Sequence, residues 1–151
     1  MALAMKKAEP SLNARALRLL ARREHSRDEL RRKLEAHLAE GENVEAVLDD
    51  LAQRGWLSDV RFAEQTIRAK ARRFGPFKLA QQLRARGVNE EAIAAAFHAA
   101  GADGQSSLEA VWKRRFREPP PDERELARQV RFLQGRGFAL EDILRFLKEE
   151  S

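Results

Sequence analysis

The chain has 151 residues and a formal net charge of +5, with 35% of its residues charged, 7% aromatic and no cysteine. The absence of cysteine excludes disulfides, thiolate metal sites and thiol nucleophiles, and it favours a reducing compartment. Apolar residues are frequent and periodic, tyrosine is absent and β-branched residues are few, so we expect an ordered, all-α protein.

The first ten residues, MALAMKKAEP, do not resemble a signal peptide, because their apolar run is short and precedes the lysines. We expect residues 1–10 to be a flexible N-terminus. No later apolar run approaches the ~20 residues of a membrane span, so we predict a cytoplasmic protein without a membrane partner.

One frame of residues occurs three times, anchored on Gly41, Gly87 and Gly137. An acidic residue follows four positions after each glycine, and apolar residues follow six and ten positions after it. These residues are Glu45, Val47 and Leu51 in the first copy, Glu91, Ile93 and Phe97 in the second, and Glu141, Ile143 and Leu147 in the third. Such internal periodicity indicates a repeat architecture. Apolar patterns and helix-start signals around each copy predict three helices per repeat, about nine in all.

The first repeat is predicted over residues 11–57. It opens with a helix over 11–24 that Ser11 caps. Its second helix follows Ser26-Arg-Asp-Glu29, a capping box whose hydroxyl and carboxylate satisfy free N–H groups at the helix start. The loop before its third helix, residues 39–43, is extended and lacks the apolar residue that follows the glycine in the other copies, so the packing of this helix is the least constrained part of the predicted fold.

The second repeat is predicted over residues 58–100. It opens with a helix over 58–73 that Ser58 caps, and its next helix follows Gly75-Pro76, with proline at the first helical position. A linker is expected over 101–105, where glycine and small polar residues indicate a hinge.

The third repeat is predicted over residues 106–151. Its first helix, expected over 106–117, starts at the capping box of Ser106 and Glu109. We expect Pro121-Asp122 to start the next helix as Gly75-Pro76 does.

The basic surplus of the chain lies in the second repeat. Between residues 61 and 86 a single acidic residue, Glu64, stands against eight basic ones: Arg61, Arg68, Lys70, Arg72, Arg73, Lys78, Arg84 and Arg86. For any one of these residues, the simplest interpretation is a position on the solvent-exposed face of a helix. For the cluster as a whole we favour a contact surface, because like charges repel one another unless a partner offsets them.

Three-helix units invite comparison with helix-turn-helix proteins, in which a late helix enters the major groove of DNA. The third helices predicted here are acidic, and their carboxylates would repel phosphate: Glu45, Asp49 and Asp50, then Glu90 and Glu91, then Glu141 and Asp142. We therefore discount sequence-specific major-groove binding. Non-specific phosphate contact by the second repeat remains open.

Residues for catalysis are not arranged in any recognisable way. His25, His37 and His98 show no metal-ligand spacing, and the adjacent carboxylates Asp49 and Asp50 point about 100° apart on a helix. We predict no enzyme activity, no cofactor and no metal.

The aromatic residues are predicted to pack between helices. This interpretation covers Trp56, Phe62, Phe97, Phe132 and Phe138. Phe74 and Phe77 lie within the basic cluster, where they could stack on bases, but packing around the helix turn is the favoured interpretation.

Four motifs in order carry a family resemblance. They are Ser26-x-x-Glu29-Leu30, GWLSD at 55–59 followed by Phe62-Ala63, RFGP at 73–76 followed by Lys78-Leu79, and FLQGRGF at 132–138. Together they resemble the RecX family, the bacterial regulators of the RecA recombinase, over residues 11–148. Each motif is weak alone, but four at repeat spacing are specific.

The resemblance implies an all-α fold of three tandem three-helix repeats in an elongated, curved molecule. It also implies that the chain binds in the groove of the RecA–DNA filament and limits its growth or promotes its disassembly. ATP hydrolysis, strand exchange and co-protease activity would be suppressed. Some members of the family also bind DNA, and a monomer is expected.

The residues expected to contact the filament are the basic side chains of the second repeat that face away from its apolar positions: Arg68, Arg72, Arg73, Lys78, Arg84 and Arg86. They would donate charge-assisted hydrogen bonds to carboxylates or phosphates. The alternative is a helical module that binds single- or double-stranded DNA non-specifically. A helical adaptor for another acidic partner is a third hypothesis.

Overall fold

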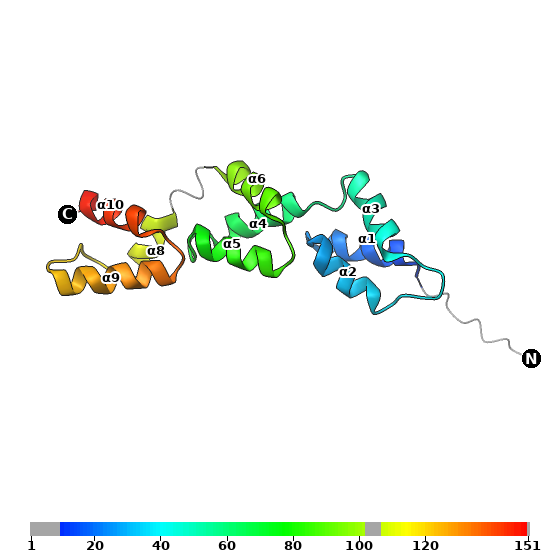
Figure 1. Cartoon of the computed structure of the whole chain (residues 1–151), viewed down its shortest axis with the longest axis horizontal. Helices are drawn as coiled ribbons and strands as arrows, with labels where there is room; N and C mark the ends of the chain where they lie inside the picture. Colours follow the sequence, from blue (N-terminus) through cyan, green and yellow to red (C-terminus); the bar gives the residue numbers. More distant parts are fainter. Residues whose placement is uncertain (1–9, 102–106, 151) are drawn as a thin grey trace, which may run out of the picture. The chain divides into compact units, whose positions relative to one another are not determined.

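The computed structural model describes residues 10–101 and 107–150, and within these ranges it contains nine α-helices and no strand (Figure 1). The chain divides into two compact units after Asp59. The first unit holds one group of three helices, and the second holds two further groups. The all-α repeat architecture predicted from the sequence is therefore confirmed.

The first repeat consists of α1 (Leu12–Arg22), α2 (Arg27–Glu35) and α3 (Val44–Gln53). Ser11 and Ser26 cap the first two helices as predicted, since their hydroxyls accept hydrogen bonds from the N–H groups of Ala14 and Glu29. The repeat has its own apolar core, formed by Leu12, Ala16, Leu30, Leu34, Val44, Leu48, Leu51 and Leu57.

The second repeat consists of α4 (Asp59–Lys70), α5 (Pro76–Ala85) and α6 (Glu90–Ala100). Pro76 occupies the first turn of α5, and its missing N–H costs nothing there. Its core combines Phe62, Ala63 and Ile67 of α4 with residues of α5 and α6, among them Leu79, Leu83, Ile93 and Ala96.

The third repeat consists of α8 (Ser107–Arg115), α9 (Glu123–Gly135) and α10 (Leu140–Glu150). Its core contains Val111, Trp112, Phe116, Leu133, Phe138, Ile143 and Leu147. Helix α9 starts directly after Pro121-Asp122 as expected, but Asp122 is its N-cap and accepts a hydrogen bond from the N–H of Glu125. Pro121 therefore precedes the helix, and the expectation that it takes the first helical position, as Pro76 does in α5, is wrong. A carboxylate at an N-cap satisfies a free N–H group, which proline cannot do.

The three anchor glycines all have positive φ, at 83° for Gly41, 82° for Gly87 and 103° for Gly137. In each repeat the third helix begins three residues after the glycine. The extra residues of the first repeat's loop therefore lie between the end of α2 at Glu35 and Gly41. The distance in sequence from the glycine to the third helix is the same in all three repeats. Val44 is buried there, as Val88 and Phe138 are after the other two glycines.

Two aromatic residues depart from the sequence-based prediction. Trp56 is 46% exposed and Phe77 is 65% exposed, so neither is a core residue. Trp56 follows α3 and lies under the guanidinium of Arg54, at 5.6 Å from the ring centroid. Phe62 and Phe138 are buried, and Phe97 and Phe132 are partly buried against the cores of their repeats, as expected. Phe74 also packs partly buried against the core of the second repeat.

Some expectations fall outside the described residues. These are the flexible N-terminus over 1–10, except for its last residue, nearly all of the linker over 101–105, and the start of the predicted capping box at Ser106.

Candidate partner-binding surface

The six residues predicted to bind a partner lie along the end of α4, the turn after it and α5. Arg68 is on α4, Lys78 and Arg84 are on α5, and Arg86 is the C-cap of α5. Because α4 ends at Lys70, Arg72 and Arg73 lie in the turn that follows, and not on the helix predicted over 58–73. The structure thus separates the six residues into several environments.

Arg68 already has partners inside the second repeat. It forms an ion pair with Glu64 one helical turn earlier, at 2.9 Å, and donates a 3.1 Å hydrogen bond to the carbonyl of Ala99. That carbonyl belongs to the last turn of α6, where carbonyl groups lack intrahelical partners. Arg68 therefore ties α4 to the end of α6 and satisfies a helix terminus.

Arg84 is paired across the turn that Gly87 makes. Its guanidinium forms a bidentate interaction with the carboxylate of Glu90, in the first turn of α6. The hydrogen bonds lower the pKa of Glu90 and raise the pKa of Arg84. One of the carboxylates expected to repel phosphate is thus offset within the repeat.

A similar arrangement offsets the acidic start of α3. Arg27 and Arg31 of α2 both bond the carboxylate of Glu45, and Arg27 also bonds Asp49 at 2.6 Å. These hydrogen bonds lower the pKa of Glu45 to about 2. The starts of α3 and α6 therefore repel anions less in the folded chain than their composition indicates.

Lys78 lies where the second and third repeats meet. A Cβ atom added at Gly137 would lie 2.5 Å from the Lys78 Cβ, closer than such atoms approach in proteins. A Cβ atom added at Gly75 would lie 2.6 Å from the carbonyl oxygen of Gly137. The RFGP and RGF motifs therefore face each other, and both need glycine because the two backbones are in contact.

Backbone hydrogen bonds hold this contact together. The N–H of Gly75 donates to the carbonyl of Arg136 at 2.7 Å, and the N–H of Phe77 donates to the carbonyl of Gly137 at 3.0 Å. Gly75 is the N-cap of α5 and has no side chain with which to cap the helix. The end of α9 thus supplies the acceptors that a capping side chain supplies elsewhere.

Arg72 and Arg73 lie beside this junction and line a cavity of about 300 Å³. The third repeat contributes Arg114, Arg115 and Arg136 to the same cavity, together with Val111 and Phe132. We call these five arginines and the cavity between them the arginine pocket. The three arginines of the third repeat are not among the contact residues predicted from the sequence. The dense basic run KRRFR at 113–117 and the Arg136 of the FLQGRGF motif were the available signals.

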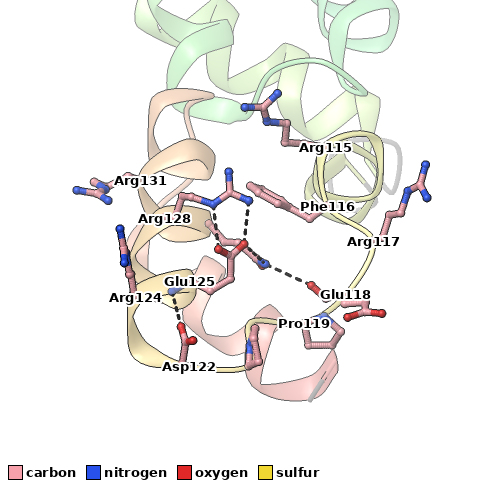
Figure 2. A pocket seen from close by; sticks show the side chains of 12 residues that line it. Arg115, Phe116, Arg117, Glu118, Pro119, Asp122, Arg124, Glu125, Arg128 and Arg131 are labelled. Atoms are coloured by element: carbon pink, nitrogen blue, oxygen red, sulfur yellow. Dashed lines mark hydrogen bonds and ion pairs between the residues drawn. The ribbon is translucent and has the colours of Figure 1, made fainter.

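A second cavity, of about 670 Å³, lies within the third repeat (Figure 2). Figure 2 shows Arg128 joined to the carboxylate of Glu125 by two hydrogen bonds, and the Arg128 guanidinium lies 5.2 Å from the ring centroid of Phe116. The side chain of Gln129 is buried, and it accepts a 2.8 Å hydrogen bond from the indole N–H of Trp112. Arg128, Glu125, Gln129 and Trp112 therefore find hydrogen-bond partners among one another within the third repeat.

Other kinds of site have no support in the described part of the chain. No cluster of three or more histidine, aspartate or glutamate side chains there could hold a metal ion. No helix in the described ranges is long and apolar enough to cross a membrane.

The fold defines the class of the chain: an all-α protein built of three-helix repeats in the part that the structure describes. Three family models match in succession. They are described as the first, second and third three-helix domains of RecX, and they match residues 14–51, 58–96 and 103–147. The chain belongs to the RecX family.

Similar proteins span nearly the whole chain. A protein of Ralstonia nicotianae named Regulatory protein RecX is 44% identical over 138 residues, which cover 91% of this chain and 87% of the relative. A protein of the same name from Leptothrix cholodnii is 40% identical over 146 residues, covering 97% and 93%. The crystal structure of RecX from Lactobacillus salivarius has the same fold, with a TM-score of 0.73 at 18% identity over 91% of this chain and 93% of that one.

Proposed function

We propose that this chain regulates the RecA recombinase by binding in the groove of the RecA–DNA filament. Binding limits filament growth or promotes disassembly, and so suppresses ATP hydrolysis, strand exchange and co-protease activity. The observation that carries the proposal is the succession of three RecX domains over residues 14–147, shared with relatives that are named regulatory proteins.

Within the predicted site, contacts in the chain divide the residues by role. Arg68 and Arg84 hold intramolecular carboxylates, so their first role is to stabilise the second repeat. Arg72 and Arg73 are exposed and have no carboxylate partner among the described residues. Their donors are available to carboxylates or phosphates that line a filament groove. We therefore assign the main contact to Arg72 and Arg73, with Lys78, Arg84 and Arg86 on the adjoining surface.

The test is the ATP hydrolysis of RecA on single-stranded DNA, measured while the concentration of this protein is raised. We expect hydrolysis to fall. If the rate is unchanged with the protein in excess over RecA, regulation of RecA is excluded. Addition of more single-stranded DNA separates two causes of inhibition, because it restores hydrolysis only where the protein acts by sequestering DNA.

The alternative function, non-specific DNA binding, is favoured by one observation: no carboxylate stands among the described residues that line the arginine pocket. A salt titration of binding to bare DNA tests it. Binding through phosphates should weaken log-linearly with salt concentration, with a slope that reports the number of phosphates neutralised. A flat salt dependence would exclude this function.

A further inference from the structure

The arginine pocket gathers like charges, and none of the described residues that line it is acidic. Of these described lining residues five are arginines, and the other two, Val111 and Phe132, are apolar. Like charges at such a site destabilise the fold unless an anion offsets them. Arg27 and Arg31 of the first repeat provide a contrast, because they share the carboxylate of Glu45.

Two phenyl rings hold three of these guanidinium groups in place. Arg136 is 5.6 Å from the ring centroid of Phe74 and 5.3 Å from that of Phe132. Arg73 lies 5.8 Å from the Phe74 centroid, and Arg115 lies 5.6 Å from the Phe132 centroid. Cation–π contacts orient a guanidinium but leave its N–H groups free to donate. The rings thus pre-organise the arginines without neutralising them.

The backbone around the pocket is held as well. The hydrogen bonds from Gly75 and Phe77 to the carbonyls of Arg136 and Gly137 join the two repeats beside the cavity. A site whose donors are positioned before the ligand arrives loses less entropy on binding. The remaining two arginines, Arg72 and Arg114, contact neither a carboxylate nor an aromatic ring among the residues that the structure describes.

We propose that the arginine pocket binds a compact oligophosphate, such as a diphosphate or triphosphate group. Planar guanidinium forks match phosphate oxygens bidentately. The cavity, at about 300 Å³, is the size of a small-ligand site. Several linked phosphates offset five positive charges, whereas a single phosphate carries at most about two negative charges. The bound anion would remove the repulsion and fasten the second repeat to the third.

This inference shares Arg72 and Arg73 with the proposed function but does not depend on it, because it can be tested without RecA. Isothermal titration calorimetry of the full chain, in low salt and without phosphate buffer, would measure binding of inorganic tripolyphosphate, inorganic phosphate and a short oligothymidylate. We expect one tripolyphosphate per chain, bound at least about tenfold more tightly than phosphate, and a rise in melting temperature on binding.

The variant Arg72→Gln/Arg114→Gln removes the two arginines that make no ring contact. It should weaken tripolyphosphate binding roughly 100-fold, while the melting temperature without ligand stays level or rises because repulsion is relieved. The matched control is Arg18→Gln/Arg22→Gln, which removes two exposed arginines of α1 and should bind as the wild type does.

A conservative variant guards against misfolding. Arg72→Lys/Arg114→Lys keeps the charge and loses the fork, so binding should weaken by less than in the glutamine variant but measurably. Equal weakening of tripolyphosphate binding in the glutamine variants of the pocket and of α1 would mean that the anion is attracted by the net positive charge of the chain. That result would overturn the proposal. Binding of oligothymidylate without binding of tripolyphosphate would also overturn it, and would assign the arginines to the phosphodiester backbone of a strand.

Discussion

The backbone N–H of Gly75 donates a 2.7 Å hydrogen bond to the carbonyl of Arg136, and this bond joins the start of α5 to the end of α9. Gly75 has no side chain to cap its helix and Pro76 has no N–H, so the next free donor is Phe77, which bonds the carbonyl of Gly137. The helix start in one repeat is thus completed by the backbone of another. The arginine pocket lies beside this junction.

The variant Gly137→Ala should open this junction. Its φ of 103° is unfavourable for alanine, and the added Cβ would lie 2.5 Å from Lys78. We expect a loss of about 2–4 kcal/mol in the free energy of unfolding. Hydrogen exchange at the Gly75 and Phe77 amides, measured by NMR, reports the junction itself and should accelerate.

The control for this change is Gly41→Ala, at the sister position of the first repeat. Its φ is 83°, but nothing lies within 4 Å of the added Cβ. This variant should lose only about 1–2 kcal/mol from backbone strain, and protection at Gly75 and Phe77 should be retained. Equal exchange rates in both variants would contradict the close backbone contact.

The buried pair of Trp112 and Gln129 should be required for the stability of the third repeat. The variant Gln129→Ala leaves the indole N–H without its acceptor and opens a cavity, so it should destabilise the chain by about 2–4 kcal/mol. Urea unfolding followed by circular dichroism measures the loss. The exposed Gln134, on the same helix, provides the control Gln134→Ala, which should change stability by about 0.5 kcal/mol or less.

A double variant separates the hydrogen bond from the packing. Trp112→Phe/Gln129→Leu removes donor and acceptor together. Its loss in the free energy of unfolding should therefore be smaller than the sum of the losses in Trp112→Phe and Gln129→Leu. Strict additivity would show that the hydrogen bond contributes nothing.

His25 should make the first repeat sensitive to acid. It is buried, and burial lowers its pKa below the ordinary value of 6.5. Its Nδ1 lies 3.0 Å from the carbonyl of Arg23, and its Nε2 lies 3.0 Å from the Lys33 Nζ, a geometry that suits a neutral ring with its proton on Nδ1. The unfolded chain binds a proton more readily than the folded one, so stability present above pH ~6.5 is lost as pH falls toward the lowered pKa.

Urea unfolding between pH 5 and pH 8 tests this dependence. The variant His25→Gln should flatten the loss of stability below pH ~6.5. His98→Gln, at an exposed position on α6, should leave the wild-type slope in place. A wild-type chain whose stability is constant across this range would contradict the assignment.

Reversing the charge of Arg72 and Arg73, which meet no carboxylate among the described residues, should weaken the proposed regulation of RecA. We expect Arg72→Glu/Arg73→Glu to need roughly 10–100-fold more protein for half-inhibition of ATP hydrolysis, because two attractive contacts become repulsive. Arg18→Glu/Arg22→Glu carries the same change in charge on α1 and should inhibit normally. Circular dichroism should show equal helix content in both, and full inhibition by the first variant would assign the contact elsewhere.

Most of the local structure could be predicted from the sequence because its causes are local. The hydroxyls of Ser11 and Ser26 cap helices within three residues of themselves, and Pro76 opens α5 through its own ring. The anchor glycines were found because each turn requires positive φ, which shows as a recurring glycine. The RecX resemblance rested on these same turns and starts.

The sequence by itself thus determined the helices, the three repeats and the family. Only the tertiary structure decided which side chains are free to bind a partner, because that depends on neighbours distant in the sequence. Trp56 and Phe77 are predicted to pack because they are aromatic, but the fold leaves both side chains exposed. Arg68 and Arg84 resemble Arg72 and Arg73 in sequence, yet carboxylates reach only the first two. Arg114, Arg115 and Arg136 join the surface because the third repeat packs against the second, a contact that no local pattern encodes.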